Sequence, residues 1–126
     1  MAKKWSFTQA SRIAGSLYGV LLLRNSDPEG YEWCVDQLVN GSSSVRDLVK
    51  KFCTSDEYRE KHLMNQTPNE FARLLCERFW GKGKSTPENI KELAVMLLED
   101  DWRQAVKYVI DSDHYGRLLG DDKVPA

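Results

Sequence analysis

Several side chains in this sequence are of types that take part in catalysis or metal binding, but they are not spaced as such sites require. His62 and His114 are types that bind metals or move protons, yet neither has a histidine or cysteine at metal-ligand spacing. Residues 81–85, Gly-Lys-Gly-Lys-Ser, resemble a phosphate loop, but they lack its four-residue gap and no strand is predicted before them. We expect both histidines to be exposed surface residues, and the sequence predicts no catalytic residue, no cofactor and no metal site, hence no enzyme.

Acidic residues and cysteines lead to the same expectation. Carboxylates gather at residues 99–101 and at 111–113, but neither cluster has the alternating ligands and glycine of a calcium loop. Negative charge beside a helix N-terminus is the simpler interpretation. Cys34, Cys53 and Cys76 are 19 and 23 residues apart (53 − 34 and 76 − 53), which fits neither a disulfide framework nor a zinc site. We interpret them as reduced core residues.

The composition is that of one ordinary folded domain. The 126 residues include 18 basic and 19 acidic side chains, a net charge of −1, so no overall field attracts nucleic acid or an anionic membrane. The most apolar stretch, residues 17–23, is far shorter than the roughly 20 residues of a membrane span, and no signal peptide is evident. We expect a cytoplasmic protein that binds other proteins, without nucleic acid or membrane insertion; its oligomeric state stays open.

Helix signals run along the whole chain. Apolar residues recur at intervals of three and four, and no segment alternates as a strand would. Gly15 and Gly19 leave a smooth face on the first helix where another backbone could approach. The predicted N-caps are Thr8, Asp27, Ser44, Ser55, Thr67, Thr86 and Ser112. The sequence therefore predicts an all-α fold, a single compact helical domain of about seven to eight helices.

One phrase of the sequence occurs twice. Residues 49–58, ending in Ser-Asp-Glu-Tyr, recur as residues 106–115, ending in Ser-Asp-His-Tyr, 57 positions later (106 − 49). In each copy the serine is expected to cap a short helix, and the tyrosine to close over the helix before it. We expect two similar halves, about 8–64 and 67–120, around one core, followed by an exposed, frayed tail at 121–126.

A binding face is the remaining functional hypothesis. Arg46 and Lys50 share one helix face, which is either a local positive patch or simply a solvated surface. Trp5 precedes the first cap, where it could dock a partner, whereas the other tryptophans are mostly core by pattern. Together with the corner residues Tyr58 and Tyr115, these form the predicted partner-binding set.

Three segments resemble a known family. Residues 45–58, preceded by Gln37-Leu38 and Gly41, are similar to the phycobilisome linker domain. Residues 110–115 with Gly120-Asp-Asp-Lys-Val-Pro125 resemble that domain's C-terminal signature. Residues 27–33 also resemble the bacterial repeat domain DUF4214, in which an aspartate, a glycine and a tryptophan recur.

The resemblance implies a non-catalytic module that organises other proteins. In the linker family those partners are phycobiliprotein discs, which would place this chain peripherally on the cytoplasmic face of thylakoids. The alternative is a DUF4214-like module that binds proteins or carbohydrate in a non-photosynthetic bacterium.

Overall fold

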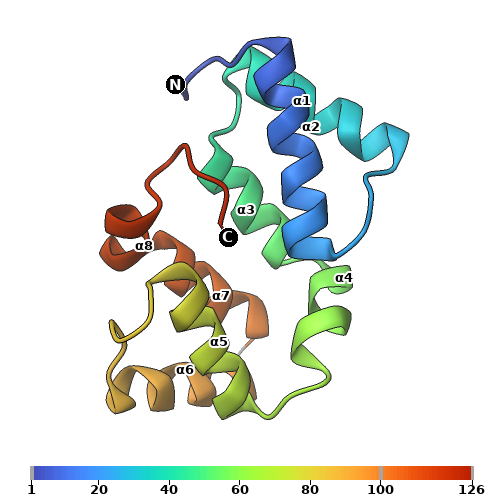
Figure 1. Cartoon of the computed structure of the whole chain (residues 1–126). Helices are drawn as coiled ribbons and strands as arrows, with labels where there is room; N and C mark the ends of the chain where they lie inside the picture. The colour runs from blue at the N-terminus through green and yellow to red at the C-terminus, as the bar shows by residue number, and fades with distance from the viewer. Residues whose placement is uncertain (1, 100, 126) are drawn as a thin grey trace.

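The fold is all-helical, as the sequence predicts. The computed structural model describes residues 2–99 and 101–125, so Asp100 of the predicted acidic cluster and Ala126 of the predicted tail lie outside the described residues. Within those ranges there are eight α-helices and two π-helical segments (Figure 1). They are α1 (Phe7–Leu17), η1 (Tyr18–Leu22), α2 (Pro28–Asn40), α3 (Val45–Cys53), α4 (Asp56–Tyr58), η2 (Arg59–Leu63), α5 (Pro68–Phe79), α6 (Pro87–Glu99), α7 (Trp102–Asp111) and α8 (Asp113–Leu118). Among the described residues, no helix is long and apolar enough to cross a membrane.

Local capping chemistry starts most of these helices where the sequence predicts. Asp27 accepts a hydrogen bond from Gly30 N, and Ser44 and Thr67 form reciprocal capping boxes. The first cap is a correction, because Ser6 and not Thr8 begins α1. Ser6 Oγ accepts from Gln9 N at 3.2 Å while Gln9 Oε1 accepts from Ser6 N at 3.3 Å, so Thr8 lies inside the first turn.

The helices form two groups that meet at α3 and α7. Helix α1 packs on α2, and α5 packs on α6. Helix α3 contacts α1 and η1 on one side and α7 on the other, and Figure 1 shows it in the middle of the molecule. The similarity of the two halves stays a prediction; the order of the elements agrees with it, since each half ends in a helix followed by a short capped helix.

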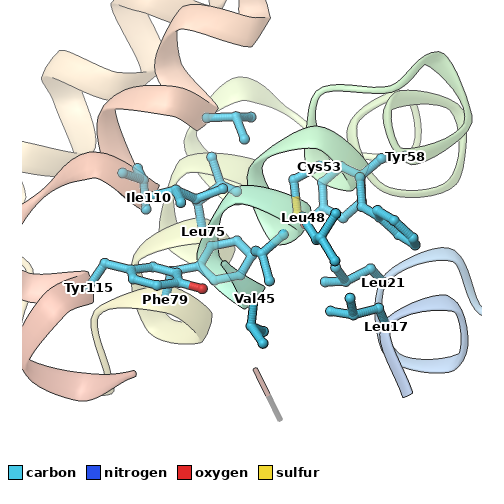
Figure 2. Close-up of a cluster of buried hydrophobic side chains, with 14 of the residues drawn as sticks. Leu17, Leu21, Val45, Leu48, Cys53, Tyr58, Leu75, Phe79, Ile110 and Tyr115 are labelled. Atoms are coloured by element: carbon cyan, nitrogen blue, oxygen red, sulfur yellow. The ribbon is translucent and has the colours of Figure 1, made fainter. Parts of the chain in front are cut away.

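The core runs continuously from one group to the other. Figure 2 shows Leu17, Leu21 and Tyr58 at one end and Phe79, Ile110 and Tyr115 at the other, with side chains of α3 between them. Each of the labelled residues is at most 2% exposed. The cysteines are free and buried, as predicted. Gly15 and Gly19 differ from expectation, because both are exposed and no atom of another element lies within 4 Å of a Cβ built there.

The C-terminal tail is exposed over residues 121–123, as expected, but its end is a correction. Asp121 O accepts a hydrogen bond from Arg46 N at 3.1 Å, Val124 packs against the core, and Pro125 is buried. Figure 1 shows this segment, in red, turning back from α8 towards α3. The tail is held because it supplies an acceptor to the first turn of α3 and an apolar side chain to the core, two non-local contacts that local polarity does not reveal.

The buried hydroxyl of Tyr115 leads to a stability prediction. The side chain is 0% exposed, and among the described residues its hydroxyl has no hydrogen-bond partner. A buried polar group without a partner costs roughly 1–3 kcal/mol. Tyr115→Phe is therefore expected to raise the free energy of unfolding by about 1 kcal/mol in urea titrations.

Tyr58 provides the matched control at the other corner. Burial raises the pKa of Tyr58, and the Cys53 and Arg78 side chains lie near enough to its hydroxyl to act on that pKa. With these polar neighbours, Tyr58→Phe should be neutral or destabilising by up to about 1 kcal/mol. Equal destabilisation by both substitutions would contradict the account of Tyr115.

Candidate partner-binding surface

Arg46, the first residue of the predicted binding set, binds the end of helix α7. Its Nε donates to Ile110 O at 2.9 Å and a terminal nitrogen donates to Ser112 O, also at 2.9 Å. Its guanidinium carbon lies 4.9 Å from the centroid of the Tyr115 ring. The side chain is 21% exposed, so most of its bonding capacity is used inside the protein.

Arg103 makes the reciprocal contact from α7 to the end of α3. Its Nε donates to Thr54 O at 2.9 Å and its Nη2 donates to the Asp56 carboxylate at 2.6 Å. Arg46 and Arg103 are the second residues of their helices and are 57 positions apart (103 − 46), the offset of the repeated phrase. Each helix therefore presents an arginine that satisfies carbonyl groups at the other's C-terminus.

The remaining predicted residues also have internal roles. Lys50 forms an ion pair with Asp111. Tyr58 and Tyr115 are 2% and 0% exposed, so neither ring is available to a partner in this conformation. Trp5 is half-buried, with Lys3 Nζ 4.0 Å from its ring centroid. The structure does not gather the five residues into one surface, and their role in binding stays a hypothesis.

The corners form as the sequence predicts. Ser55 Oγ accepts from Tyr58 N at 3.2 Å and donates to Phe52 O at 2.6 Å. At the second copy, Ser112 Oγ accepts from Tyr115 N at 3.3 Å and donates to Val109 O at 2.7 Å. The serine in each copy thus satisfies a carbonyl of the preceding helix and an N–H of the following helix. This structural role explains why the serine occurs in both copies.

The histidines differ from the expectation of exposed residues, because both are half-buried against aromatic rings. The His62 ring lies 4.3 Å from that of Tyr58, and the His114 ring lies 4.8 Å from that of Trp80. His62 Nε2 is 2.8 Å from Leu21 O. Burial lowers the pKa of His62, which favours the neutral ring as the donor to that carbonyl.

The carbonyl end of η1 is held by three side chains from later in the chain. Arg78 donates to Val20 O at 2.7 Å, His62 contacts Leu21 O, and Lys61 donates to Leu22 O. Three consecutive carbonyls are thereby satisfied by η2 and α5. This cluster joins the first helix to the start of the second group, and it leaves His62 without the surroundings of a metal ligand.

An ion-pair network adjoins this cluster through Lys61, which contacts both Leu22 O and Glu57. Arg24 Nε donates to Glu57 at 2.7 Å, Lys61 Nζ donates to Glu57 at 2.8 Å, and Arg24 also reaches Asp27 at 3.3 Å. The hydrogen bond from Arg24 lowers the pKa of Glu57 to about 2, although burial acts against this shift. The positive charge of Arg24 is thus already balanced by carboxylates of the protein itself.

The depressed pKa of Glu57 predicts a specific acid sensitivity. The unfolded chain binds a proton at Glu57 near pH 4.5, and the folded chain only near pH 2. The stabilisation is therefore present above pH 4.5 and is lost as the pH falls towards 2. Because the group is one-third exposed, we expect a loss of only about 1–2 kcal/mol.

Urea titrations of the wild type and Glu57→Gln between about pH 2 and 6 measure this loss. The difference between their unfolding free energies should shrink as the pH falls. Glu92→Gln is the control, since Glu92 is exposed and forms no ion pair in the part of the chain that the structure describes. A difference that does not change with pH would contradict the role of Glu57.

Beside this network lies a groove with aromatic walls, which we name the Trp33 groove. It has a volume of about 240 Å³ and is lined by Tyr18, Leu22, Arg24, Trp33, Lys51, Phe52, Ser55 and Glu57. The Tyr18 and Phe52 rings meet edge to face, with centroids 4.8 Å apart. Trp33 is 38% exposed, and Lys51 Nζ lies 4.6 Å from its ring centroid.

The sequence dictates the local geometry of this groove. Tyr18 follows α1 without a break, and its hydroxyl occupies space beside Gly30 in the first turn of α2. A Cβ at Gly30 would lie 1.9 Å from that hydroxyl, so only glycine leaves the Tyr18 ring in place. The partial exposure of Trp33 differs from the expectation that it is mostly buried. The sequence contains a signal for this, because Trp33 lies outside the stripe of inward-facing residues Tyr31, Cys34, Val35 and Leu38, and a position outside that stripe predicts an outward ring.

These features do not resemble an active site. Burial raises the pKa of Cys34 and Cys76 to about 11 and that of Cys53 to about 12, so the thiols stay protonated at neutral pH. No group of three metal-ligating side chains occurs within residues 2–99 and 101–125. The structure is a small helical domain, and the aromatic rings that partly line the Trp33 groove give it exposed apolar surface of the kind that protein-interaction sites use.

Comparison with known proteins identifies the family. The model of the family described as Phycobilisome Linker polypeptide matches residues 22–126, which is most of the chain. The chain therefore belongs to the phycobilisome linker polypeptide family. The family resemblance predicted from residues 45–58 and 110–125 is thus confirmed, while the relation to DUF4214 stays a prediction.

Several curated proteins are similar to this chain. Phycobiliprotein ApcE from a Nostoc species is 29% identical over 89 residues, 71% of this chain and 8% of that protein. The phycobilisome rod-core linker polypeptide CpcG2 from Thermosynechococcus vestitus is 25% identical, over 71% of this chain and 36% of its own length. A phycoerythrin-associated rod linker of 27.9 kDa from Microchaete diplosiphon is 26% identical, with the same two coverages. The match spans less than two-fifths of each of these proteins.

Proposed function

We propose that this chain is a non-catalytic structural linker that organises phycobiliproteins within a phycobilisome. The observation that supports this most strongly is the family match over residues 22–126. The names of the similar proteins describe phycobiliproteins and the linkers associated with them. We propose the same partners here, and a peripheral location on the cytoplasmic face of thylakoids.

The physical properties of the domain suit such a role. Its core is continuous across both helix groups, so it can act as a rigid spacer between partners. Its exposed apolar side chains include Leu23, Trp33 and Met64, which are 63%, 38% and 63% exposed. Surface aromatic and aliphatic side chains provide binding energy when a partner covers them, whereas charges set orientation.

Sedimentation velocity tests the proposed function. The chain is mixed with purified phycobiliprotein discs, and the chain is followed by a fluorescent label while the discs are followed by their visible absorption. We expect the chain to sediment with the discs in a saturable ratio. A labelled chain that sediments alone at every disc concentration would overturn the proposal and leave the DUF4214-like alternative.

A further inference from the structure

The Trp33 groove is suited to one side chain of a partner and not to a cofactor. Its volume of about 240 Å³ is below the roughly 300–1,000 Å³ of small-molecule sites. Its apolar lining consists of the rings of Tyr18, Trp33 and Phe52 and the side chain of Leu22. The polar side chains of Arg24, Lys51, Ser55 and Glu57 complete the lining. A pocket of this size and composition accepts an aliphatic or aromatic side chain presented by another protein.

The walls of the groove are held in place before any partner binds. Tyr18 contacts Phe52 edge to face and lies under the Arg24 guanidinium, whose carbon is 5.0 Å from the ring centroid. Arg24 is in turn fixed by Glu57. A preformed pocket loses little side-chain entropy on binding, so the apolar contact contributes more of its free energy to affinity.

The charges around the groove leave one cation uncompensated. Glu57 pairs with both Arg24 and Lys61, and Asp27 pairs with Arg24, so two carboxylates balance these two cations. Lys51 forms no ion pair with any residue in the two described ranges, and its ammonium group lies over the Trp33 ring. The groove therefore presents an apolar pocket with a single available positive charge at its edge.

We infer that the Trp33 groove binds a segment of a phycobiliprotein that carries an apolar side chain next to a carboxylate. The apolar side chain enters between Trp33 and Phe52, and the carboxylate pairs with Lys51. This inference rests on the proposed function for the identity of the partner. The complementary charge and the pocket size specify the chemistry of the segment.

The second half of the chain offers a matched control surface. Positions 57 residues after Lys51 and Glu57 are Tyr108 and His114, and both line another groove together with Lys107, Asp111 and Asp113. That groove is larger, with a volume of about 740 Å³, and polar or charged side chains line most of it, including the carboxylates of Asp111 and Asp113. Tyr108→Ala removes a half-exposed aromatic ring there, and Lys107→Glu reverses a charge there.

Titration of labelled chain with purified phycobiliprotein discs, followed by fluorescence anisotropy, tests the inference. We expect Trp33→Ala and Lys51→Glu each to raise Kd at least about tenfold. Lys51→Gln should weaken binding less than Lys51→Glu, and should reduce the salt dependence of Kd. Tyr108→Ala and Lys107→Glu should stay within about twofold of the wild type. Circular dichroism and Tm confirm that each variant is folded, and Trp33→Phe provides a milder substitution if Trp33→Ala is not.

The possible results separate the two proposals. Wild-type binding with unchanged Kd in Trp33→Ala and Lys51→Glu overturns the groove while leaving the linker function intact. Equal losses in the control variants also overturn the groove, since a general surface effect would then explain them. Absence of wild-type binding overturns both proposals. Self-association of the chain alone that Trp33→Ala abolishes would assign the groove to a second copy and overturn the inference.

Discussion

Truncation of Phe79 to alanine is expected to lower the free energy of unfolding by about 3–5 kcal/mol. Phe79 is fully buried at the end of α5, and its ring centroid lies 5.8 Å from that of Tyr115. In Figure 2 the two rings lie side by side at one end of the core. Removing the Phe79 ring leaves a cavity where α5 meets α8, the second corner helix.

Urea titrations followed by circular dichroism measure this change. Typical domains are stable by only about 5–15 kcal/mol, so the variant should lose a large share of its stability and unfold at a clearly lower urea concentration than the wild type. Leu98→Ala is the control, because Leu98 is 72% exposed and should change stability by less than about 0.5 kcal/mol. Similar midpoints for the two variants would show that the core does not extend to Phe79.

Removal of the Arg46 side chain is expected to cost about 2–3 kcal/mol, the second largest effect. Arg46→Ala leaves Ile110 O and Ser112 O without their donor, and it removes the guanidinium from the Tyr115 ring. Arg46→Lys should recover less than half of the loss, because one ammonium cannot reproduce the planar fork that binds two carbonyls. Arg103→Ala should cost less, about 1 kcal/mol, because its side chain is 36% exposed.

The same urea titrations measure these losses. Lys91→Ala is the control, because it removes an exposed cation that forms no ion pair within the described ranges. An Arg46→Ala variant as stable as Lys91→Ala would contradict the contact between α3 and α7 that both arginines make. Full recovery by Arg46→Lys would mean that positive charge alone, and not the two hydrogen bonds, stabilises the end of α7.

Local chemistry made much of the fold predictable from the sequence. The caps at Asp27, Ser44 and Ser55 depend on residues within three positions of one another, so the sequence shows both partners together. The prediction of Thr8 as the first cap was wrong, because Ser6 and Gln9 satisfy each other's hydrogen-bonding groups and start the helix two residues earlier (8 − 6). The all-α class and the number of α-helices followed from these signals and from the period of the apolar residues, whereas the two π-helical segments η1 and η2 did not.

The surface was less predictable, because its chemistry depends on contacts between distant positions. Arg46 reaches a carbonyl 64 residues away, so its basic side chain suggested a binding patch while its bonds are internal. The tail has a polar sequence, yet Val124 packs against the core and Pro125 is buried. The Trp33 groove combines residues of η1, α2, α3 and α4, and only the folded chain brings them together.

Sedimentation of phycobilisomes from the organism that carries this gene tests the central claim most directly. Intact phycobilisomes are separated on a density gradient, and the chain is quantified by mass spectrometry in every fraction. We predict that the chain peaks in the phycobilisome fraction at a fixed ratio to the phycobiliproteins, and that the Trp33→Ala variant expressed in its place is depleted from that fraction. A chain that stays at the top of the gradient, apart from the phycobiliproteins, would contradict its role as a linker.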